Sequence, residues 1–213
     1  MADGLRVRVR DPIRKERIFI SAVELIAQRG YQSVNLEDIG SAAGIVGSGI
    51  YRHFESKIAI LVELFERVVD RLIGDAERSL QDCGDPPCTL RRLVTDQIVF
   101  TVTERSLCQV YVSEAHNLPE ADARRLRWKQ RHYIDLWHDV LMALRPDLSP
   151  GAAQSIVYAA IGSIHSVLRY EPLLEGDALI AQLLDIAMGV LGVPLADTHP
   201  SPRVVAVAKD ADQ

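Results

Sequence analysis

The chain has 213 residues, of which 48% are hydrophobic, and its formal net charge is −5. A chain of this length and apolar content can bury a substantial core, which excludes a disordered or fibrous protein. The charge is unevenly distributed, since residues 1–57 hold nine Lys and Arg against seven Asp and Glu, and the remainder hold fifteen against twenty-two. A basic front and an acidic remainder are typical of a molecule that presents one end to phosphates.

The cysteines and the hydropathy of the chain bear on its compartment. Cys83, Cys88 and Cys108 are odd in number, form no C-x-x-C pair and have no zinc-ligand spacing around them. This pattern favours a reducing compartment, so we expect a cytoplasmic protein without metal or cofactor. No apolar run reaches the roughly 18 to 20 residues that cross a bilayer, and the N-terminus is rich in Arg, so we expect no export and no membrane partner.

The first predicted helix spans 12–29. Asp11 is suited to be its N-cap, Pro12 fits the first helical position because its missing N–H costs nothing there, and Gly30 follows the last turn. Its apolar residues form one stripe of an amphipathic helix. These residues are Ile18, Ala22, Leu25 and Ile26.

Two shorter helices are predicted next. Asn35 can cap a helix of about two turns, with Asp38 completing an imperfect capping box. Gly44 then supplies the left-handed turn into a third helix, which has to fit between Val46 and His53. Two short helices joined by a glycine turn predict a helix-turn-helix.

The rest of the chain predicts a larger all-helical bundle. A long connecting helix, with Ser56 as its expected N-cap, runs from Ser56 to about Leu80, and a Gly- and Pro-containing break follows at 81–88. Thr89 is the expected cap of the next helix, and nine helices are expected in all: three compact, one bridging and five in the bundle. The last five helices are expected at about 89–105, 106–117, 120–144, 150–170 and 177–192.

This pattern predicts an all-α fold with four parts. They are a flexible basic arm at 1–11, a three-helix helix-turn-helix domain at 12–55, a helical domain at 56–193, and a disordered tail at 194–213.

Several short motifs follow one another at fixed spacing between positions 30 and 57. They are Gly30-Tyr31, Leu36-Glu37-Asp38-Ile39, Ala42-Ala43-Gly44-Ile45, Ile50-Tyr51-Arg52-His53-Phe54 and Ser56-Lys57. In this order and spacing, residues 12–65, about a quarter of the chain, resemble the TetR family of transcriptional regulators. The C-terminal half resembles the family only in length and helix count. The resemblance implies a DNA-binding head and a helical bundle for effector binding and dimerisation.

The resemblance also implies that the third helix lies in the major groove, with its Tyr and His on the DNA backbone. This chain departs from the family pattern there, because Val46 cannot cap the helix and Gly47 and Gly49 carry no side chain to read bases. Two glycines should each cost about 1 kcal/mol relative to Ala, so we expect the helix to order fully only on DNA. The expected DNA-binding residues are Asn35, Val46, Gly47, Ser48, Gly49, Tyr51, Arg52, His53 and Lys57.

An arginine-rich arm precedes the first helix. Arg6, Arg8 and Arg10 alternate along it, and such an arm can enter a minor groove as homeodomain arms do. The alternative is an unstructured tail that contributes only salt-dependent attraction.

Aromatic and polar residues recur in the larger half, where the resemblance implies an effector pocket. Tyr133 and Trp137 share one helix face, and Tyr158, His165 and Arg169 share another. The alternative is that such aromatics are simply core. A mostly apolar ligand derived from a lipid, an acyl thioester or a steroid is expected, with an anionic end met by His165 or Arg169. The expected ligand-binding residues are Tyr111, Glu114, His116, Tyr133, Trp137, Tyr158, His165 and Arg169.

The last two helices combine small residues with large aliphatic ones, which favours close packing. The resemblance implies that they form a four-helix bundle across a two-fold axis, and packing within the chain is the alternative. The expected dimer-interface residues are Ala152, Ile156, Ala160, Ser163, Leu184, Ala187 and Leu191.

We expect a repressor that binds a palindromic operator in double-stranded DNA as a homodimer and is released by its ligand. An all-helical enzyme or a helical adaptor without DNA binding is the alternative. No H-E-x-x-H metal motif, phosphate-binding glycine loop or nucleophile elbow occurs in the sequence, so no catalytic residues are assigned and an enzyme is not expected.

Overall fold

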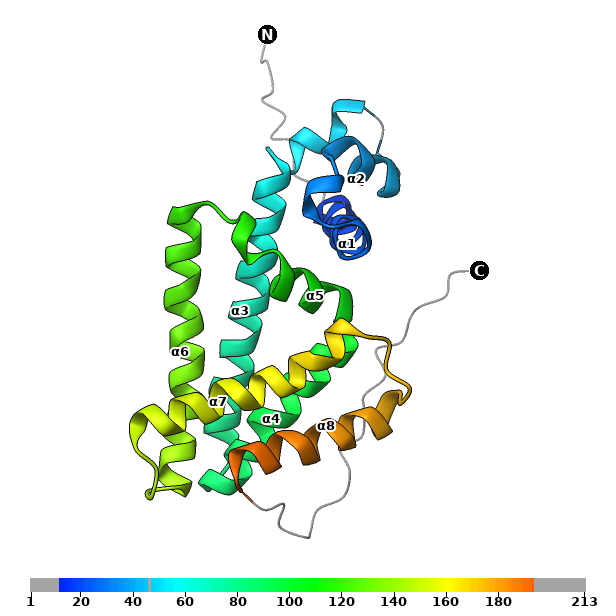
Figure 1. Ribbon diagram of the computed structural model, residues 1–213. Helices are drawn as coiled ribbons and strands as arrows, with labels where there is room; N and C mark the ends of the chain where they lie inside the picture. The colour runs from blue at the N-terminus through cyan, green and yellow to red at the C-terminus, as the bar shows by residue number, and fades with distance from the viewer. Residues whose placement is uncertain (1–11, 46, 194–213) are drawn as a thin grey trace.

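A computed structural model describes residues 12–45 and 47–193, so the basic arm, Val46 and the tail beyond 193 lie outside the described residues. The described chain is helical throughout, with a small head at one end of a larger body (Figure 1). Its α-helices are α1 (Pro12–Arg29), α2 (Leu36–Ala42), α3 (Lys57–Asp82), α4 (Pro86–Thr103), α5 (Arg105–Ser113), α6 (Glu120–Leu144), α7 (Pro150–His165) and α8 (Gly176–Leu191).

The head consists of α1, α2 and the short element η2 (Gly47–Arg52). Asn35 caps α2 in a complete capping box, because its side chain accepts a bond from the Asp38 N–H while Asp38 accepts one from the Asn35 N–H. Gly44 has the left-handed φ of 67° that the turn requires. The third helix, predicted as an ordinary short helix, is a 3₁₀ helix here. Two glycines in six residues disfavour the α conformation.

Helix α3 connects the head to the body along most of the length of the molecule (Figure 1). Ser56 caps it as expected, since its Oγ accepts a hydrogen bond from the Ala59 N–H. The cap expected at Thr89 is wrong: α4 begins three residues earlier, with Asp85 as the cap and two prolines in the first turn. Those prolines lack N–H groups at positions where none is needed, so they begin the helix rather than break it.

The body is built from α3 and the five helices α4 to α8. Helix α8 packs against α4 and α7, and α6 packs against α3, where Lys129 pairs with Asp70 at 2.6 Å and Arg125 with Glu66 at 2.7 Å. Helix α7 ends at His165, and a 3₁₀ turn, Ser166–Arg169, completes the segment that was expected to be one helix to residue 170.

The segment Pro150–Arg169 is long and apolar enough, by length and composition alone, to cross a membrane. Its mean hydropathy is 1.2, so the expectation that no such run exists is wrong. Only 33% of it is buried in the chain. Much of its apolar surface therefore faces outward.

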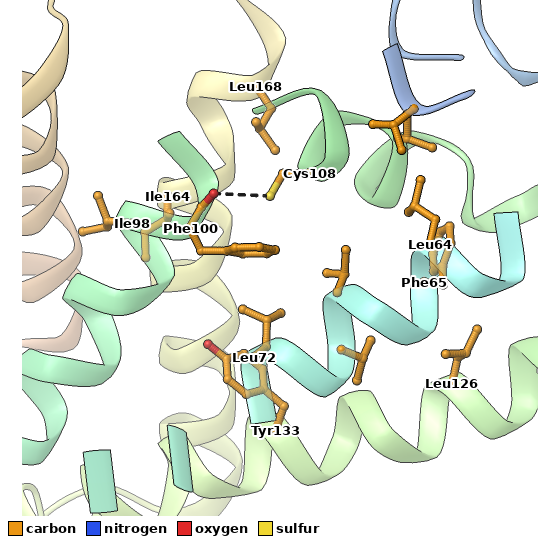
Figure 2. Close-up of a cluster of buried hydrophobic side chains, with 14 of the residues drawn as sticks. Leu64, Phe65, Leu72, Ile98, Phe100, Cys108, Leu126, Tyr133, Ile164 and Leu168 are labelled. Atoms are coloured by element: carbon orange, nitrogen blue, oxygen red, sulfur yellow. Dashed lines mark hydrogen bonds between the residues drawn. The ribbon is translucent and has the colours of Figure 1, made fainter. Parts of the chain in front are cut away.

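One hydrophobic core runs from the head into the body. Figure 2 shows a part of it that includes Phe65 of α3, Phe100 of α4 and Tyr133 of α6. The Cys108 thiol lies in this cluster and donates a weak hydrogen bond to the Phe100 carbonyl oxygen, 3.9 Å away. Burial raises the pKa of that thiol to about 12, so Cys108 is an inert core residue.

Candidate nucleic-acid interface and ligand pocket

The surface of the head around η2 carries the side chains that the sequence assigns to DNA. Ser48, Tyr51 and Arg52 are exposed, and Tyr51 keeps 54% of its surface accessible. Ile50 and Phe54 point into the core and anchor the segment on both sides. His53 is half-buried, with its Nδ1 atom enclosed and without a hydrogen-bond partner among the described residues. Only one edge of that ring can therefore reach outward.

Two predicted DNA residues, Lys57 and Asn35, are engaged within the chain. The Lys57 ammonium donates to the carbonyl oxygens of Tyr31 and Val34 at 2.5 and 2.6 Å and lies 4.1 Å from the centre of the Tyr31 ring. It thereby ties α3 to the loop between α1 and α2. Asn35 is committed to the cap of α2. Both side chains therefore stabilise the head, whether or not they also contact DNA.

Two shallow hollows meet on this face of the head. One lies between α2 and η2 and is bordered by Glu37, Ser48 and Tyr51. The other lies beside the start of α3 and is bordered by Asn35, Tyr51 and Lys57. Tyr51 stands between them. The starts of α2 and α3 thus open onto one surface with the recognition segment, and the acidic residues Glu37 and Asp38 lie in the first turn of α2.

The body contains a pocket of about 590 Å³, which is within the size range of small-molecule sites. It collects side chains from α3, α4, α5, α6 and α7, and among the described residues that line it none is acidic. The lining residues are Leu72, Gln97, Tyr111, Arg127, Gln130, Arg131, Tyr133, Ile134, Tyr158, Ile161 and His165. Tyr133 and Leu72 also border the core cluster of Figure 2, so the pocket opens directly beside the core.

Hydrogen bonds organise the inner wall of the pocket. The Tyr133 hydroxyl donates to Gln97 Oε1 at 2.6 Å, and Gln97 Nε2 lies 3.2 Å from His165 Nε2. Because an amide nitrogen can only donate, His165 Nε2 accepts and the ring keeps its proton on Nδ1. Burial lowers the pKa of His165 to about 4, so the ring is neutral at pH 7. The inner wall is polar but uncharged.

Tyr111 lies on a second part of the wall. Its hydroxyl accepts a hydrogen bond of 2.6 Å from Gln130 Nε2, so its own proton is available to another acceptor. Burial raises the pKa of Tyr111 to about 12, which keeps the hydroxyl protonated. Its ring packs against Phe65 of α3, with ring centres 4.9 Å apart.

Positive charge gathers at the rim of the pocket. Arg127 and Arg131 lie one turn apart on α6, and both are exposed. Arg127 pairs with Glu120 at 2.9 Å, whereas Arg131 has no ion pair among the described residues. Arg127, Arg131, Gln97 and Gln130 were not among the residues expected at the pocket, because helical periodicity does not show which face of α4 or α6 the neighbouring helices leave open.

Four residues that were assigned to the pocket lie elsewhere. Trp137 is fully buried in the core, which agrees with the alternative reading of the aromatics. Arg169 is exposed on the turn after α7 and does not line the pocket. Glu114 and His116 lie where α5 ends near the head, where Glu114 accepts a bond from Asn117 Nδ2 at 2.7 Å. Tyr111, Tyr133, Tyr158 and His165 do line it.

The outer faces of α7 and α8 are apolar and exposed. Ile186 and Val190 keep 42% and 37% of their surface accessible. Three residues expected at a dimer interface, Ala160, Ala187 and Leu191, are fully buried and belong to the chain's own interior, where α7 packs against α8. Small and aliphatic residues that remain open or half-open on this face are Ala152, Ile156, Ala159, Gly162, Ser163, Ala181, Leu184 and Gly189.

Comparison with known proteins gives matches to both parts of the chain. A family model described as bacterial regulatory proteins of the tetR family matches residues 18–64. The transcriptional repressor KstR2 of Mycolicibacterium smegmatis is 26% identical over 199 residues, covering 87% of this chain and 94% of that protein. KstR2 of Rhodococcus jostii is 28% identical over 131 residues, covering 61% of this chain and 64% of that protein.

Solved structures extend the similarity over the body. A TetR-family regulator from Bordetella parapertussis superposes with a TM-score of 0.77 at 25% identity, over 88% of this chain and all of that one. The ketosteroid regulator KstR2 of Mycobacterium tuberculosis gives 0.74 at 21% identity, over 88% and 97%. AibR, solved with isovaleryl coenzyme A and operator DNA, gives 0.69 at 18% identity, over 84% and 96%.

Proposed function

Because the chain belongs to the tetR family of bacterial transcriptional regulators, we propose that it is a repressor that binds a palindromic operator as a homodimer and leaves it when a mostly apolar ligand fills the body pocket. The protein acts in the cytoplasm and is not an enzyme. One observation carries the proposal: helix α5 lines the pocket with Tyr111 and packs against α1 of the head. A ligand in the pocket therefore touches the element on which the head rests.

Recognition of DNA is assigned to η2 and its surroundings. Ser48 and Arg52 are exposed and can contact base edges. Because Gly47 and Gly49 have no side chains, the backbone can approach the DNA closely there. Tyr51 and the outward edge of His53 contact phosphates, which position the head without reading sequence. Lys57 and Asn35 hold the surface in shape, and their contact with phosphate, like that of Val46, stays a prediction.

Dimerisation is assigned to the outer faces of α7 and α8. Their apolar surface is exposed on the single chain, and a two-fold pairing of two such helices would bury it. A short recognition segment contacts only a few base pairs, so two heads are needed for a specific site. The partner is a second copy of this chain.

The pocket suits an amphipathic ligand in a particular orientation. Its inner wall offers hydroxyl and imidazole donors with no carboxylate, which favours a neutral acceptor such as a carbonyl oxygen. His165 brings no positive charge to an anion at pH 7, because burial lowers the pKa of its ring. The anionic end of the ligand therefore belongs at the rim, with Arg127 and Arg131. Lipid acids, acyl thioesters and steroid acids fit this pattern; KstR2 is described as a ketosteroid regulator, and AibR was solved with isovaleryl coenzyme A.

The contacts of α5 suggest how occupancy reaches the head. Just beyond α5, Asn117 accepts a hydrogen bond from Gln32 Nε2 in the head at 2.6 Å. Glu114 adds a charge near Lys57, where it opposes the lowering of the Lys57 pKa that burial causes. A shift of α5 by a ligand at Tyr111 would disturb this junction and change the spacing of the two heads. The ligand would thereby weaken DNA binding. By linkage, DNA then weakens ligand binding by the same factor.

The effector is tested with matched acids and esters. Thermal shift assays would compare a long-chain fatty acid, its acyl-coenzyme A thioester and a steroid carboxylic acid with the methyl esters of the two acids. Arg131→Gln should weaken binding of the acids about tenfold, the loss expected for one charge-assisted hydrogen bond, and leave the esters unchanged. The control is Arg124→Gln, since Arg124 lies on α6 but does not line the pocket.

Hits are then added to the protein on its upstream DNA in a gel-shift assay. Release of DNA by the hits, and weaker release from Arg131→Gln, supports the mechanism. Ligands that bind both arginine variants equally would place the anionic end elsewhere. Saturating ligand that leaves DNA affinity unchanged would overturn the sensing mechanism.

A further inference from the structure

A third hollow on the head lies between α1 and the recognition segment and measures about 300 Å³. Three arginines surround it, and none of the described residues that line it is acidic. Arg14 and Arg17 come from α1, one turn apart, and Arg52 comes from the end of η2. The remaining wall is formed by Gly44, Ile45, Ser48 and Gly49.

Two glycines make this hollow possible. Gly44 has a positive φ and turns the chain away from α2. A Cβ atom at Gly49 would lie 2.8 Å from Ile45 Cγ2, so a larger residue there would push the two segments apart. The same absence of side chains that weakens η2 as a helix leaves backbone exposed between three guanidinium groups.

Arg17 and Arg52 both bring positive charge to the hollow. Neither Arg17 nor Arg52 forms an ion pair with a carboxylate among the described residues, although basic groups nearby do. Lys15, two residues before Arg17, pairs with Glu63 at 2.6 Å, and Arg67 pairs with Glu16 at 2.8 Å. Like charges gathered around one hollow repel each other, and an anion placed there relieves that repulsion.

The hollow belongs to the face that meets DNA. It shares Gly44, Ile45 and Ser48 with the groove between α2 and η2, which extends to Tyr51. A different hollow, on the other side of Tyr51, is bordered by Ser56 and Lys57 at the start of α3, and Glu37 and Glu55 also line it. Basic groups therefore lie on both sides of the recognition segment, and of these two hollows the one beside α1 has no acidic residue among its described lining residues.

We propose that this hollow binds a backbone phosphate of duplex DNA, with Arg17 as its principal ligand, so that α1 is part of the DNA interface. The inference rests on the proposed DNA-binding function. It gives each head a phosphate contact on either side of a recognition segment that has few side chains of its own. Guanidinium groups suit this role because their N–H groups match the geometry of phosphate oxygens.

The test compares two arginines of the same helix. The full-length protein first selects a binding duplex from a random pool, and its affinity is measured between 50 and 200 mM salt for the parent, Arg17→Gln and Arg29→Gln. Arg29 is exposed at the other end of α1 and does not line the hollow. Arg17→Gln should lower the slope of log affinity against log salt by about 1 per head, and Arg29→Gln should leave it unchanged. Arg17→Lys, which keeps the charge, should retain most of the slope.

A neutral methylphosphonate, placed at each phosphate of the selected duplex in turn, locates the contact. At one phosphate per half-site, the substitution should weaken the parent several-fold and have no further effect on Arg17→Gln. Equal salt slopes for Arg17→Gln and Arg29→Gln, or no such phosphate, would overturn this inference while leaving the proposed function intact. A parent protein that selects no duplex would overturn the proposed function itself.

Discussion

The head and the body place their functional groups in opposite ways. In the head, most of the groups assigned to DNA come from one short stretch, 47–53, which is held by caps and a glycine turn, and Arg17, Asn35 and Lys57 lie beside it. In the body, the pocket draws on five helices that are far apart in the sequence, and its polar groups are tied to each other by hydrogen bonds. Local rules therefore govern the first site, and the packing of whole helices governs the second.

This difference also sets how each site tolerates change. An exposed side chain in the head can be replaced with little effect on folding, so its loss is expected to appear in DNA affinity. A buried polar residue in the pocket is part of a network, and its loss leaves a partner unsatisfied. Substitutions in each part can show whether the head and the body are as separate as this difference suggests.

The largest effect is expected from a substitution in the body that lowers the DNA affinity of the head. Ile186→Asp places a charge on the exposed apolar face of α8 and should prevent dimerisation. Operator affinity should then fall about 100-fold or more, because two linked heads bind far more tightly than one. Sedimentation equilibrium and gel shift measure the two effects. Leu173→Asp, in the fully exposed loop before α8, is the control. An Ile186→Asp protein that remains dimeric would move the interface elsewhere.

The second effect concerns the neutral histidine of the pocket. The pKa of His165 is about 4 in the folded chain and 6.5 without burial, so between these values the unfolded state binds a proton that the folded state does not. The free energy of unfolding should therefore fall as the pH is lowered from 6.5 towards 4, by up to about 1.4 kcal/mol per pH unit from this residue. Urea unfolding at pH 7, 6 and 5 should show a shallower pH dependence for His165→Asn. His116→Asn, at an exposed histidine, should behave as the parent does.

The third effect distinguishes recognition of bases from contact with phosphates in the head. If Arg52 bonds a guanine, Arg52→Ala should cost about 1 to 3 kcal/mol more on the operator than on random duplex. We expect this difference because Arg52 is exposed and Gly47 and Gly49 offer no competing side chains. Binding titrations on both duplexes measure it. Equal losses would show that Arg52, like Arg17, only positions the head on phosphates.

The smallest effect is expected from a single hydroxyl. Tyr51→Phe keeps the ring and removes one hydrogen bond from an uncharged hydroxyl to a phosphate, so binding should weaken by about 1.5 kcal/mol, the lower end for a bond to a charged group, on every duplex alike. Its salt slope should match that of the parent, in contrast to Arg17→Gln, since no charge is lost. A loss confined to the operator would mean that Tyr51 reads bases.

The sequence predicted much of the fold because helix ends depend on a few neighbouring residues. The limits of α1 and α6 match the expected ranges, and the caps at Asn35 and Ser56 are confirmed. Two errors arose where local signals compete. Pro86 and Pro87 were read as a break but form the first turn of α4, and the third helix of the head is a 3₁₀ turn because its glycines do not support an α-helix.

The pocket was predicted only in part, because periodicity shows which residues share a helix face but not what that face meets. Trp137 lies one turn from Tyr133 on α6, yet one is sealed in the core and the other borders the pocket. The same limit applies to the outer helices, where Ala160 and Ala187 had the small size of interface residues but fill the seam between α7 and α8.

The sequence by itself determined the helical class, the family of the head and the residues that the head exposes, since caps, turns and short motifs act within a few residues of each other. Only the tertiary structure decided that Arg127 and Arg131 stand at a pocket rim, that His165 is neutral, and that Arg17 faces the recognition segment. These properties depend on burial and on charges brought together from distant helices. The burial of a side chain and the electrostatic field at it are set by the packing of the whole chain, so a local sequence pattern does not determine them.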